Sequence, residues 1–211
     1  MIVYPEKKLL IMTPPHTASR AIHITLCRQF TGKMIWAFGP TPDGFGDDHH
    51  TNKICNQWLD FRVAIVVRNP FTRILGLWYH LVNWNREHGH GCDDFKVFVQ
   101  RVARDDETVL SWLYRYTITR WLGTVRPDVF VHYEDLDREL SELLATEITL
   151  ERTSSGNRKP STEFYYDDET ARLVATWAGS DLARFKYSEP WRVDSVQKGV
   201  HLPEAAFSDV T

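Results

Sequence analysis

Apolar residues along the chain gather in short runs and in longer stretches with helical spacing, and the two kinds alternate. The short runs predict strands at residues 9–12, 33–38, 62–67 and 128–132. The longer stretches predict helices at residues 17–30, 71–84, 95–102, 109–122, 136–145 and 167–185. Strands that alternate with helices are typical of an α/β domain, in which helices cover a mainly parallel sheet.

Two strand–loop–helix units stand out in this pattern. The first joins residues 9–12 to the helix from residue 17, and the second joins residues 62–67 to the helix from residue 71. The run RVAIVV at 62–67 is apolar on both faces, as expected for a strand in the middle of a parallel sheet. Because open parallel sheets bind ligands beyond the carboxyl ends of their strands, we expect His16 and Arg68 to meet in one crevice.

The loop of the first unit has the composition of an anion-binding turn. It consists of turn formers and small polar residues, namely Thr13, Pro14, Pro15, His16 and Thr17. Backbone N–H groups at the start of the following helix, together with its dipole, favour a negatively charged group there. An ordinary strand-to-helix turn of an α/β domain explains the same pattern. The loop is not a Walker A motif, because GxxxxGK[ST] is absent from it.

Length and composition restrict the class of protein. The 211 residues, 43% apolar and 25% charged, predict one soluble domain at residues 1–188, followed by a tail with little pattern at residues 189–211. A net charge of −3 argues against a nucleic-acid binder. No apolar run approaches about 18 residues, so no membrane helix is expected, and the first residues do not resemble a signal peptide. The three cysteines are widely spaced, which predicts reduced thiols, a cytoplasmic protein and no zinc site.

Four segments carry a resemblance to a known family. VAIVVRNPFTRILGLWYHL resembles the strand–loop–helix signature of sulfotransferases that use 3′-phosphoadenosine 5′-phosphosulfate (PAPS), VR-[ND]-P-[YFW]-x-R-[LI]-x-S-x-Y. IMTPPHTASRAI is similar to the 5′-phosphosulfate loop of that family, and FVHYEDL is similar to one of its later strands. STEFYYDDETARLVATWAGSDLARFKYS resembles the ending of carbohydrate-type members, YYDEET…Y…D…LF.YS. In order and spacing, the four segments cover most of residues 9–188.

The resemblance implies both a fold and an activity. The fold is the P-loop NTPase-like sulfotransferase fold, with a central parallel sheet of about four or five strands flanked by helices. The carbohydrate-type members that the chain resembles are those of the heparan and chondroitin sulfotransferases, and the implied activity is transfer of a sulfuryl group from PAPS to an acceptor hydroxyl, expected on a carbohydrate. The product nucleotide is 3′-phosphoadenosine 5′-phosphate (PAP). No metal, nucleic acid or membrane partner is implied.

The resemblance assigns the first loop to the 5′-phosphosulfate group. The matching residues are Pro15, His16, Thr17, Ala18, Ser19 and Arg20. His16 stands where the family has a lysine, whose charge stabilises the leaving oxygen in the transition state. A histidine can do this when it is protonated, and its unperturbed pKa is about 6.5. Arg20, in place of a small hydroxyl residue, is a second source of positive charge.

The second signature and a later loop supply the other donor contacts. Arg68 matches the arginine that binds the 3′-phosphate, and a guanidinium grips such oxygens in pairs. Gly76 stands where the family has a serine, so its hydroxyl is missing here. Arg73 is the second arginine of the signature, with a structural salt bridge on the helix as the alternative. Arg158 and Lys159 resemble a basic loop that closes over the nucleotide, with a solvated polar loop as the alternative.

The acceptor hydroxyl needs a general base, which carbohydrate-type members often supply from an H-x-[ST] segment before the second signature. His49-His50-Thr51 has this form, with His49 in the matching place. We therefore assign His49 as the base, with His50, Asp47 or Asp48 as substitutes. A solvent-facing histidine pair or an adventitious metal contact is the alternative.

Two other functions compete with sulfuryl transfer. The loss of the loop lysine and of the helix serine favours a degenerate module that binds PAP or PAPS without turnover. A P-loop kinase is the other alternative, and the missing Walker lysine argues against it. Stabilisation by PAP but not by ATP would separate the first two functions from the kinase.

Overall fold

Five strands form one sheet in the order β3-β1-β2-β4-β5. The strands are β1 (Ile2–Tyr4), β2 (Leu9–Met12), β3 (Ile35–Trp36), β4 (Arg62–Val67) and β5 (Val129–His132). This computed structural model describes residues 1–31, 33–36, 52–88, 94–105, 116–151 and 162–188. β2, β4 and β5 are parallel neighbours, with Met12 opposite Ile65 and Val67 opposite His132. The predicted α/β class, with a mostly parallel sheet flanked by helices, is confirmed.

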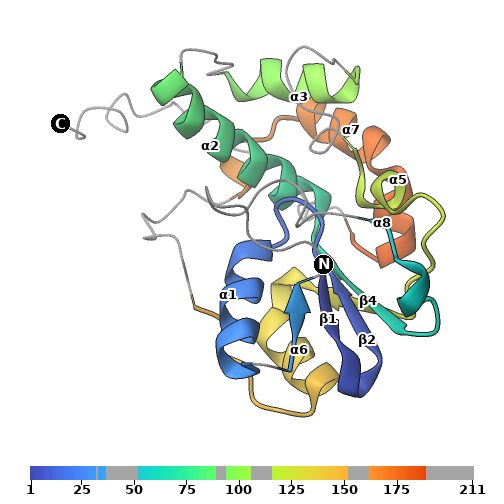
Figure 1. Cartoon of the computed structure of the whole chain (residues 1–211). Coiled ribbons are helices and arrows are strands. Elements are labelled where there is room, and N and C mark those ends of the chain that lie inside the picture. Colours follow the sequence, from blue (N-terminus) through green and yellow to red (C-terminus); the bar gives the residue numbers. More distant parts are fainter. Residues whose placement is uncertain (32, 37–51, 89–93, 106–115, 152–161, 189–211) are drawn as a thin grey trace.

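The helices around the sheet are α1 (Ser19–Gln29), α2 (Pro70–His88), α3 (Phe95–Ala103), α5 (Ile118–Leu122), α6 (Leu136–Leu144), α7 (Asp168–Trp177) and α8 (Gly179–Phe185). Short 3-10 helices lie at Pro5–Lys7, Asn56–Trp58, Tyr133–Asp135 and Thr162–Phe164. Figure 1 shows α1 and α6 beside the sheet, and α2, α3 and α7 gathered at one end of the molecule.

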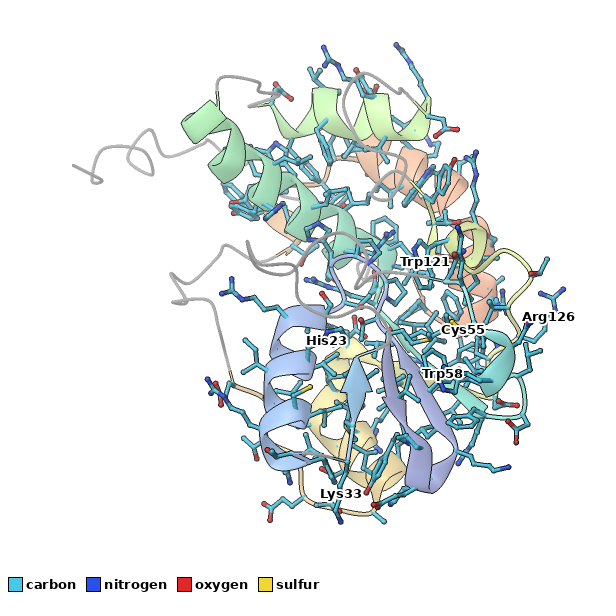
Figure 2. The ribbon with its side chains drawn as sticks, in the orientation of Figure 1. His23, Lys33, Cys55, Trp58, Trp121 and Arg126 are labelled. Carbon is cyan, nitrogen blue, oxygen red and sulfur yellow. The ribbon has the colours of Figure 1, made fainter. Side chains whose placement is uncertain are left out.

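Both faces of the sheet are buried, which explains why its strands read as continuous apolar runs. Leu9 and Ile11 of β2 pack with α1 and α6, whereas Leu10 and Met12 pack with α5 and α8. Trp121 of α5 is 2% exposed and belongs to the second cluster, against which Trp58 also packs; Figure 2 labels both rings. The middle layer is therefore held from both sides, and the carboxyl ends of β2, β4 and β5 meet at one edge.

A third apolar cluster joins α2, α3 and α7. Capping explains where two of its helices begin. The Asp94 side chain accepts from the Val97 amide before α3, and Asp167 and Thr170 form a capping box at the start of α7. This layer projects α2 away from the end of β4, so that the first turns of α2 stand over the loop that follows β2.

Two elements differ from the expectation. Residues 167–185 form two helices instead of one, because the helix breaks at Ala178, whose ψ is 14°. The break lets Val174 pack in the cluster of α2 and α3 while Phe185 packs against the sheet. The second difference is β1, an additional strand that pairs antiparallel with both β2 and β3. Its three residues are too few to show a period.

Other expectations are tested in part or lie outside the described residues. Within the described part of the chain, no helix combines the length and the apolar character needed to cross a membrane. Cys27 and Cys55 form no disulfide bond, and the cytoplasmic location stays a prediction. The predicted helix at 109–122 is described only from α5 onward, and the predicted tail at 189–211 lies outside the described residues.

Candidate functional site

The loop between β2 and α1 is a tight turn with unusual backbone conformations. His16 and Ala18 both lie in the left-handed region, with φ of 63° and 61°. Left-handed residues within such a turn make backbone N–H groups point to one side and form anion-binding concavities. Inside the turn, the Thr17 hydroxyl donates to the Pro14 carbonyl at 2.7 Å. Ala18 at the N-cap contributes no side-chain acceptor to the first turn of α1, unlike the Ser, Thr, Asp or Asn that usually stands there.

A buried histidine of α1, His23, contacts the first residue of this loop. It was not identified from the sequence. The ring Nε2 of His23 lies 3.2 Å from the Thr13 hydroxyl, and both side chains are 1% exposed. Figure 2 shows His23 on α1. Thr13 is the first residue after β2, so this contact joins the start of the loop to the helix that ends it.

Arg68, the residue after β4, contacts the loop directly. Its Nη1 donates to the His16 carbonyl at 2.9 Å, and its Nε donates to the Thr72 hydroxyl at 3.1 Å. The guanidinium lies over the Tyr133 ring, 4.0 Å from its centroid. Burial lowers the pKa of Arg68, and the nearby Tyr133 and Glu134 partly oppose this effect. The loop after β2 and the residue after β4 are therefore joined by a hydrogen bond, as expected.

Gly76 lies against the same guanidinium. A Cβ atom at this position would stand 3.2 Å from Arg68 Nη1, closer than an ordinary contact. Thr72 and Gly76 are four residues apart on α2 and share one face of the helix, which faces Arg68. Because Gly76 has no side chain, the Arg68 guanidinium can lie against α2 at this position.

Arg73 is buried and also binds the loop after β2. It is 2% exposed, and it donates from Nε to the Pro15 carbonyl and from Nη1 to the Tyr116 carbonyl, each at 3.0 Å. Burial lowers the pKa of Arg73 to about 10, while the charge of Asp181 opposes this effect. A salt bridge on the helix surface, the alternative left open by the sequence, does not describe this side chain.

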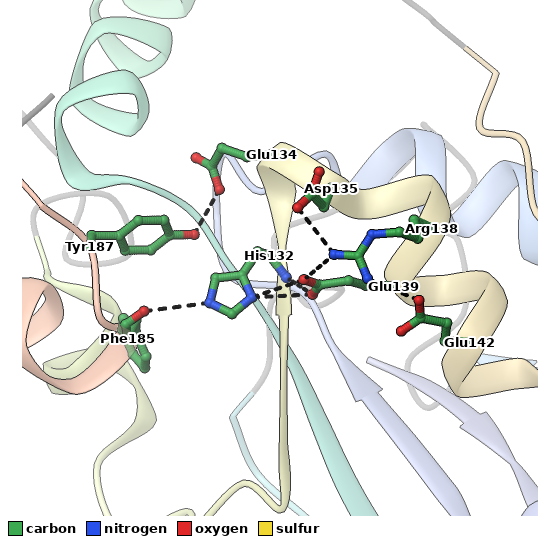
Figure 3. A network of polar contacts seen from close by, with 8 residues as sticks. All are labelled: His132, Glu134, Asp135, Arg138, Glu139, Glu142, Phe185 and Tyr187. Carbon is green, nitrogen blue, oxygen red and sulfur yellow. Dashed lines mark hydrogen bonds and ion pairs between the residues drawn. The ribbon is translucent and has the colours of Figure 1, made fainter.

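The end of β5 completes the edge of the sheet. Tyr133 supports Arg68, and the Glu134 carboxylate accepts from the Asn69 amide at 3.0 Å and from the Tyr187 hydroxyl at 2.8 Å. Figure 3 shows Tyr187 pointing at Glu134 and the His132 ring between Glu139 and the Phe185 carbonyl. Residues after three adjacent parallel strands are thereby tied to one another and to the C-terminal helices.

The closing segment of the sequence has roles that its pattern alone did not reveal. The Tyr166 hydroxyl donates to the Phe71 carbonyl at 2.9 Å. The buried Asp181 carboxylate accepts from the amides of Ile118 and Thr119 at 2.7 Å each, and so caps the start of α5. Both contacts hold elements that surround the loop, which makes these residues structural supports.

Another residue missed by the sequence is His80. Its ring centroid lies 5.3 Å from that of His16, in an edge-to-face arrangement. The available signal was the four-residue spacing of Thr72, Gly76 and His80, which places all three on one face of α2. A search of the helix for side chains in register with Gly76 would have found it.

Several predicted residues are placed, and others lie outside the described part of the chain. The structure brings Pro15 and His16 together with Arg68 and Arg73, and it leaves Arg20 exposed at the start of α1. Outside the described residues are His49, His50, Asp47, Asp48, Arg158 and Lys159. The roles assigned to all these side chains stay predictions.

A hollow of the described surface lies away from this loop. It has a volume of about 420 Å³ and lies between β5 and α6, where Arg62, His132 and Glu139 line it. The loop after β2 contributes nothing to it. Salt bridges of Arg138 with Asp135 and Glu142 lie close by on α6, so this hollow is the gap beside an edge strand.

Comparison with known proteins gives one structural similarity. A sulfotransferase from Alicyclobacillus acidocaldarius matches 85% of this chain and 94% of its own, with 14% sequence identity and a TM-score of 0.45. No protein-family model matches the chain, and no curated protein sequence matches it.

Proposed function

We propose that the protein is a sulfotransferase that moves a sulfuryl group from PAPS to an acceptor hydroxyl on a carbohydrate. The proposal rests on the resemblance of the loop and strand segments to the signatures of that family. It rests also on the placement of those segments beside each other at the carboxyl ends of two adjacent parallel strands. A nucleotide with two anionic groups needs two anion-binding positions in one crevice, and open parallel sheets bind ligands at this edge.

The observation that carries the proposal is the hydrogen bond from Arg68 Nη1 to the His16 carbonyl. It brings the arginine assigned to the 3′-phosphate to the turn assigned to the 5′-phosphosulfate. A guanidinium has five N–H donors. Two of these are used by His16 and Thr72, and the other three have no acceptor among the described residues. Arg68 can therefore stay attached to the loop and still bind phosphate oxygens.

The residues have distinct tasks in the proposed transfer. The loop amides after Pro15 hold the donor phosphate, and protonated His16 places positive charge beside it. Arg68 fixes the 3′-phosphate while it rests on Tyr133. His49 takes the proton of the acceptor hydroxyl as the acceptor oxygen bonds to sulfur. The bond from sulfur to the bridging oxygen breaks, and the phosphate of PAP keeps the electron pair, which is why positive charge at the loop speeds the reaction.

Isothermal titration with PAP tests the donor site. Wild-type protein should bind PAP and show no binding of ATP under the same conditions. Arg68→Ala should weaken PAP binding by about 2–4 kcal/mol, the usual effect of removing one partner of a buried charged contact. Arg126, which is exposed in the turn before β5, provides the control, and Arg126→Ala should bind as the wild type does. Wild-type protein without measurable affinity for PAP would end the proposal.

Transfer of radiolabelled sulfate from PAPS to a panel of carbohydrates tests the reaction itself. Turnover that is lost in His49→Ala would support both the enzyme and its base. Binding of PAP without turnover on any acceptor would favour the degenerate binding module instead. Parental turnover in His49→Ala would reject the assignment of the base and leave the donor site intact.

A further inference from the structure

His80 stands beside the donor loop on an element that the loop signature does not include. The edge-to-face contact of its ring with His16 has a centroid separation of 5.3 Å. His16 is held in place by its own backbone, because its carbonyl accepts from Arg68 and its φ of 63° fixes the turn. The two rings therefore come from separate elements, the loop after β2 and the second turn beyond Arg73 on α2.

The face of α2 that carries His80 also contacts Arg68. Thr72, Gly76 and His80 share one face of α2, and the middle position has no side chain. His80 is exposed and His16 is half-buried, so a molecule lying on the loop can reach both rings. The same helix face leads from Arg68 through Gly76 to the histidine pair.

Among the described residues, three arginines lie at or beside the loop, and the Glu134 carboxylate acts on one of them, Arg68. Arg68 and Arg73 donate to the carbonyls of His16 and Pro15, and Arg20 lies in the first turn of α1. Guanidinium groups stay charged throughout the range from about pH 6 to pH 8, whereas the unperturbed pKa of a histidine, about 6.5, lies within it. Although the His80 side chain is exposed, the protein atoms beside its ring displace part of its hydration, which lowers its pKa. An anion placed beside the ring would favour its protonated form and oppose this effect.

We propose that His80 is a further donor-binding residue, which joins His16 in binding the phosphosulfate group of the nucleotide and takes up a proton when that group binds. The inference rests on the proposed function, and it assigns to α2 a contact that the loop alone would not provide. The anion, His16 and His80 then form one hydrogen-bonded unit, with both rings donating N–H groups to the anionic oxygens. No covalent change accompanies the step, and the proton comes from the solvent.

This arrangement makes donor affinity depend on pH. Below the pKa of the free His80 ring, the proton is already present and binding takes up none. Between the pKa of the free ring and the raised pKa of the complex, binding takes up a proton, so affinity falls as the pH rises. Protonation of the PAP phosphate adds its own pH dependence, which is the same for every variant of the protein. The difference between variants therefore reports the side chain that was changed.

Titration calorimetry with PAP in buffers of different ionisation enthalpy measures affinity and proton uptake together. His80→Gln should bind PAP about tenfold more weakly near neutral pH and take up about half a proton less where the wild-type uptake is greatest. His80→Lys should bind at least as tightly as the wild type at pH 8 and should lose the same part of the proton uptake, since an ammonium group stays charged there. His88→Gln, a change of the same residue type two turns further along α2, should match the wild type in both quantities.

The outcomes separate this inference from the proposed function. If the wild type binds PAP and His80→Gln matches it in affinity and proton uptake, His80 is not a donor-binding residue and the proposed function stands. If affinity falls but proton uptake is unchanged in both variants, His80 acts through the fold and the inference is wrong. If the wild type itself does not bind PAP, the proposed function fails and this inference fails with it.

Discussion

The buried Arg73 guanidinium, which donates to the carbonyls of Pro15 and Tyr116, offers a test of how the loop after β2 is held. Arg73→Met removes both hydrogen bonds and keeps a flexible side chain of similar length. Each buried carbonyl that loses its partner costs about 1–3 kcal/mol. The two carbonyls together make the variant less stable by an amount on the order of 4 kcal/mol.

An opposing effect reduces this loss. Burial lowers the pKa of Arg73 from 12.5 to about 10, so the folded state already bears a cost for holding this charge. At 1.36 kcal/mol for each pKa unit, its removal returns roughly 3 kcal/mol. The carbonyls outweigh the charge by a small margin, and we expect Arg73→Met to be less stable by about 1 kcal/mol.

Urea denaturation followed by circular dichroism gives the measurement, with an unchanged slope as evidence that the folded state is the same. The expected loss lowers the melting temperature by about 2–4 °C for a chain of this size. Arg101, exposed on α3, is the matched control, and Arg101→Met should change stability by less than about 0.5 kcal/mol. A variant of Arg73 as stable as the wild type, or more stable, would show that Arg73 does not stabilise the loop.

Two further substitutions probe the neighbours of Arg68. Gly76→Ala should raise the unfolding free energy by about 0.5 kcal/mol, since alanine favours the helix by about 1 kcal/mol and part of this is lost in moving Arg68. The same variant should bind PAP several-fold more weakly, and an unchanged affinity in calorimetry would contradict the steric argument. Tyr187→Phe removes the hydroxyl that donates to Glu134 and should lower stability by about 1 kcal/mol or less. Thermal unfolding beside Arg126→Ala checks it, and a loss above about 3 kcal/mol would indicate a larger role than this one bond.

The strands of the sheet were readable from the sequence because burial on both faces leaves a simple signature. The runs at residues 9–12 and 62–67 became β2 and β4 without a shift at either end. The rule that ligands bind at the carboxyl edge of a parallel sheet predicted that His16 and Arg68 meet, and the hydrogen bond between them agrees with it. Period and composition act within a few residues, so they are sufficient for this part of the fold.

The backbone carbonyls that accept hydrogen bonds from the buried Arg73 could not be predicted from the sequence. Arg73 binds backbone carbonyls of Pro15 and Tyr116, and a carbonyl has no residue type by which a sequence could mark it. The contact of His80 with His16 depends on how closely α2 approaches the loop, which is a tertiary property. The break at Ala178 has the same origin, because its two helices pack on different clusters. These features depend on packing between elements, which local sequence patterns do not predict.

The two departures from the sulfotransferase pattern, His16 for lysine and Gly76 for serine, are connected through Arg68. The guanidinium occupies the space beside Gly76, where a Cβ atom would stand 3.2 Å from Nη1, and from that place it donates to the His16 carbonyl. A serine at 76 would push the guanidinium away from this place and weaken its hold on the loop. A weakened hold would release the His16 ring from its position beside His80. The glycine and the histidine thus depend on each other through one side chain, and restoring the serine alone should weaken donor binding instead of improving it.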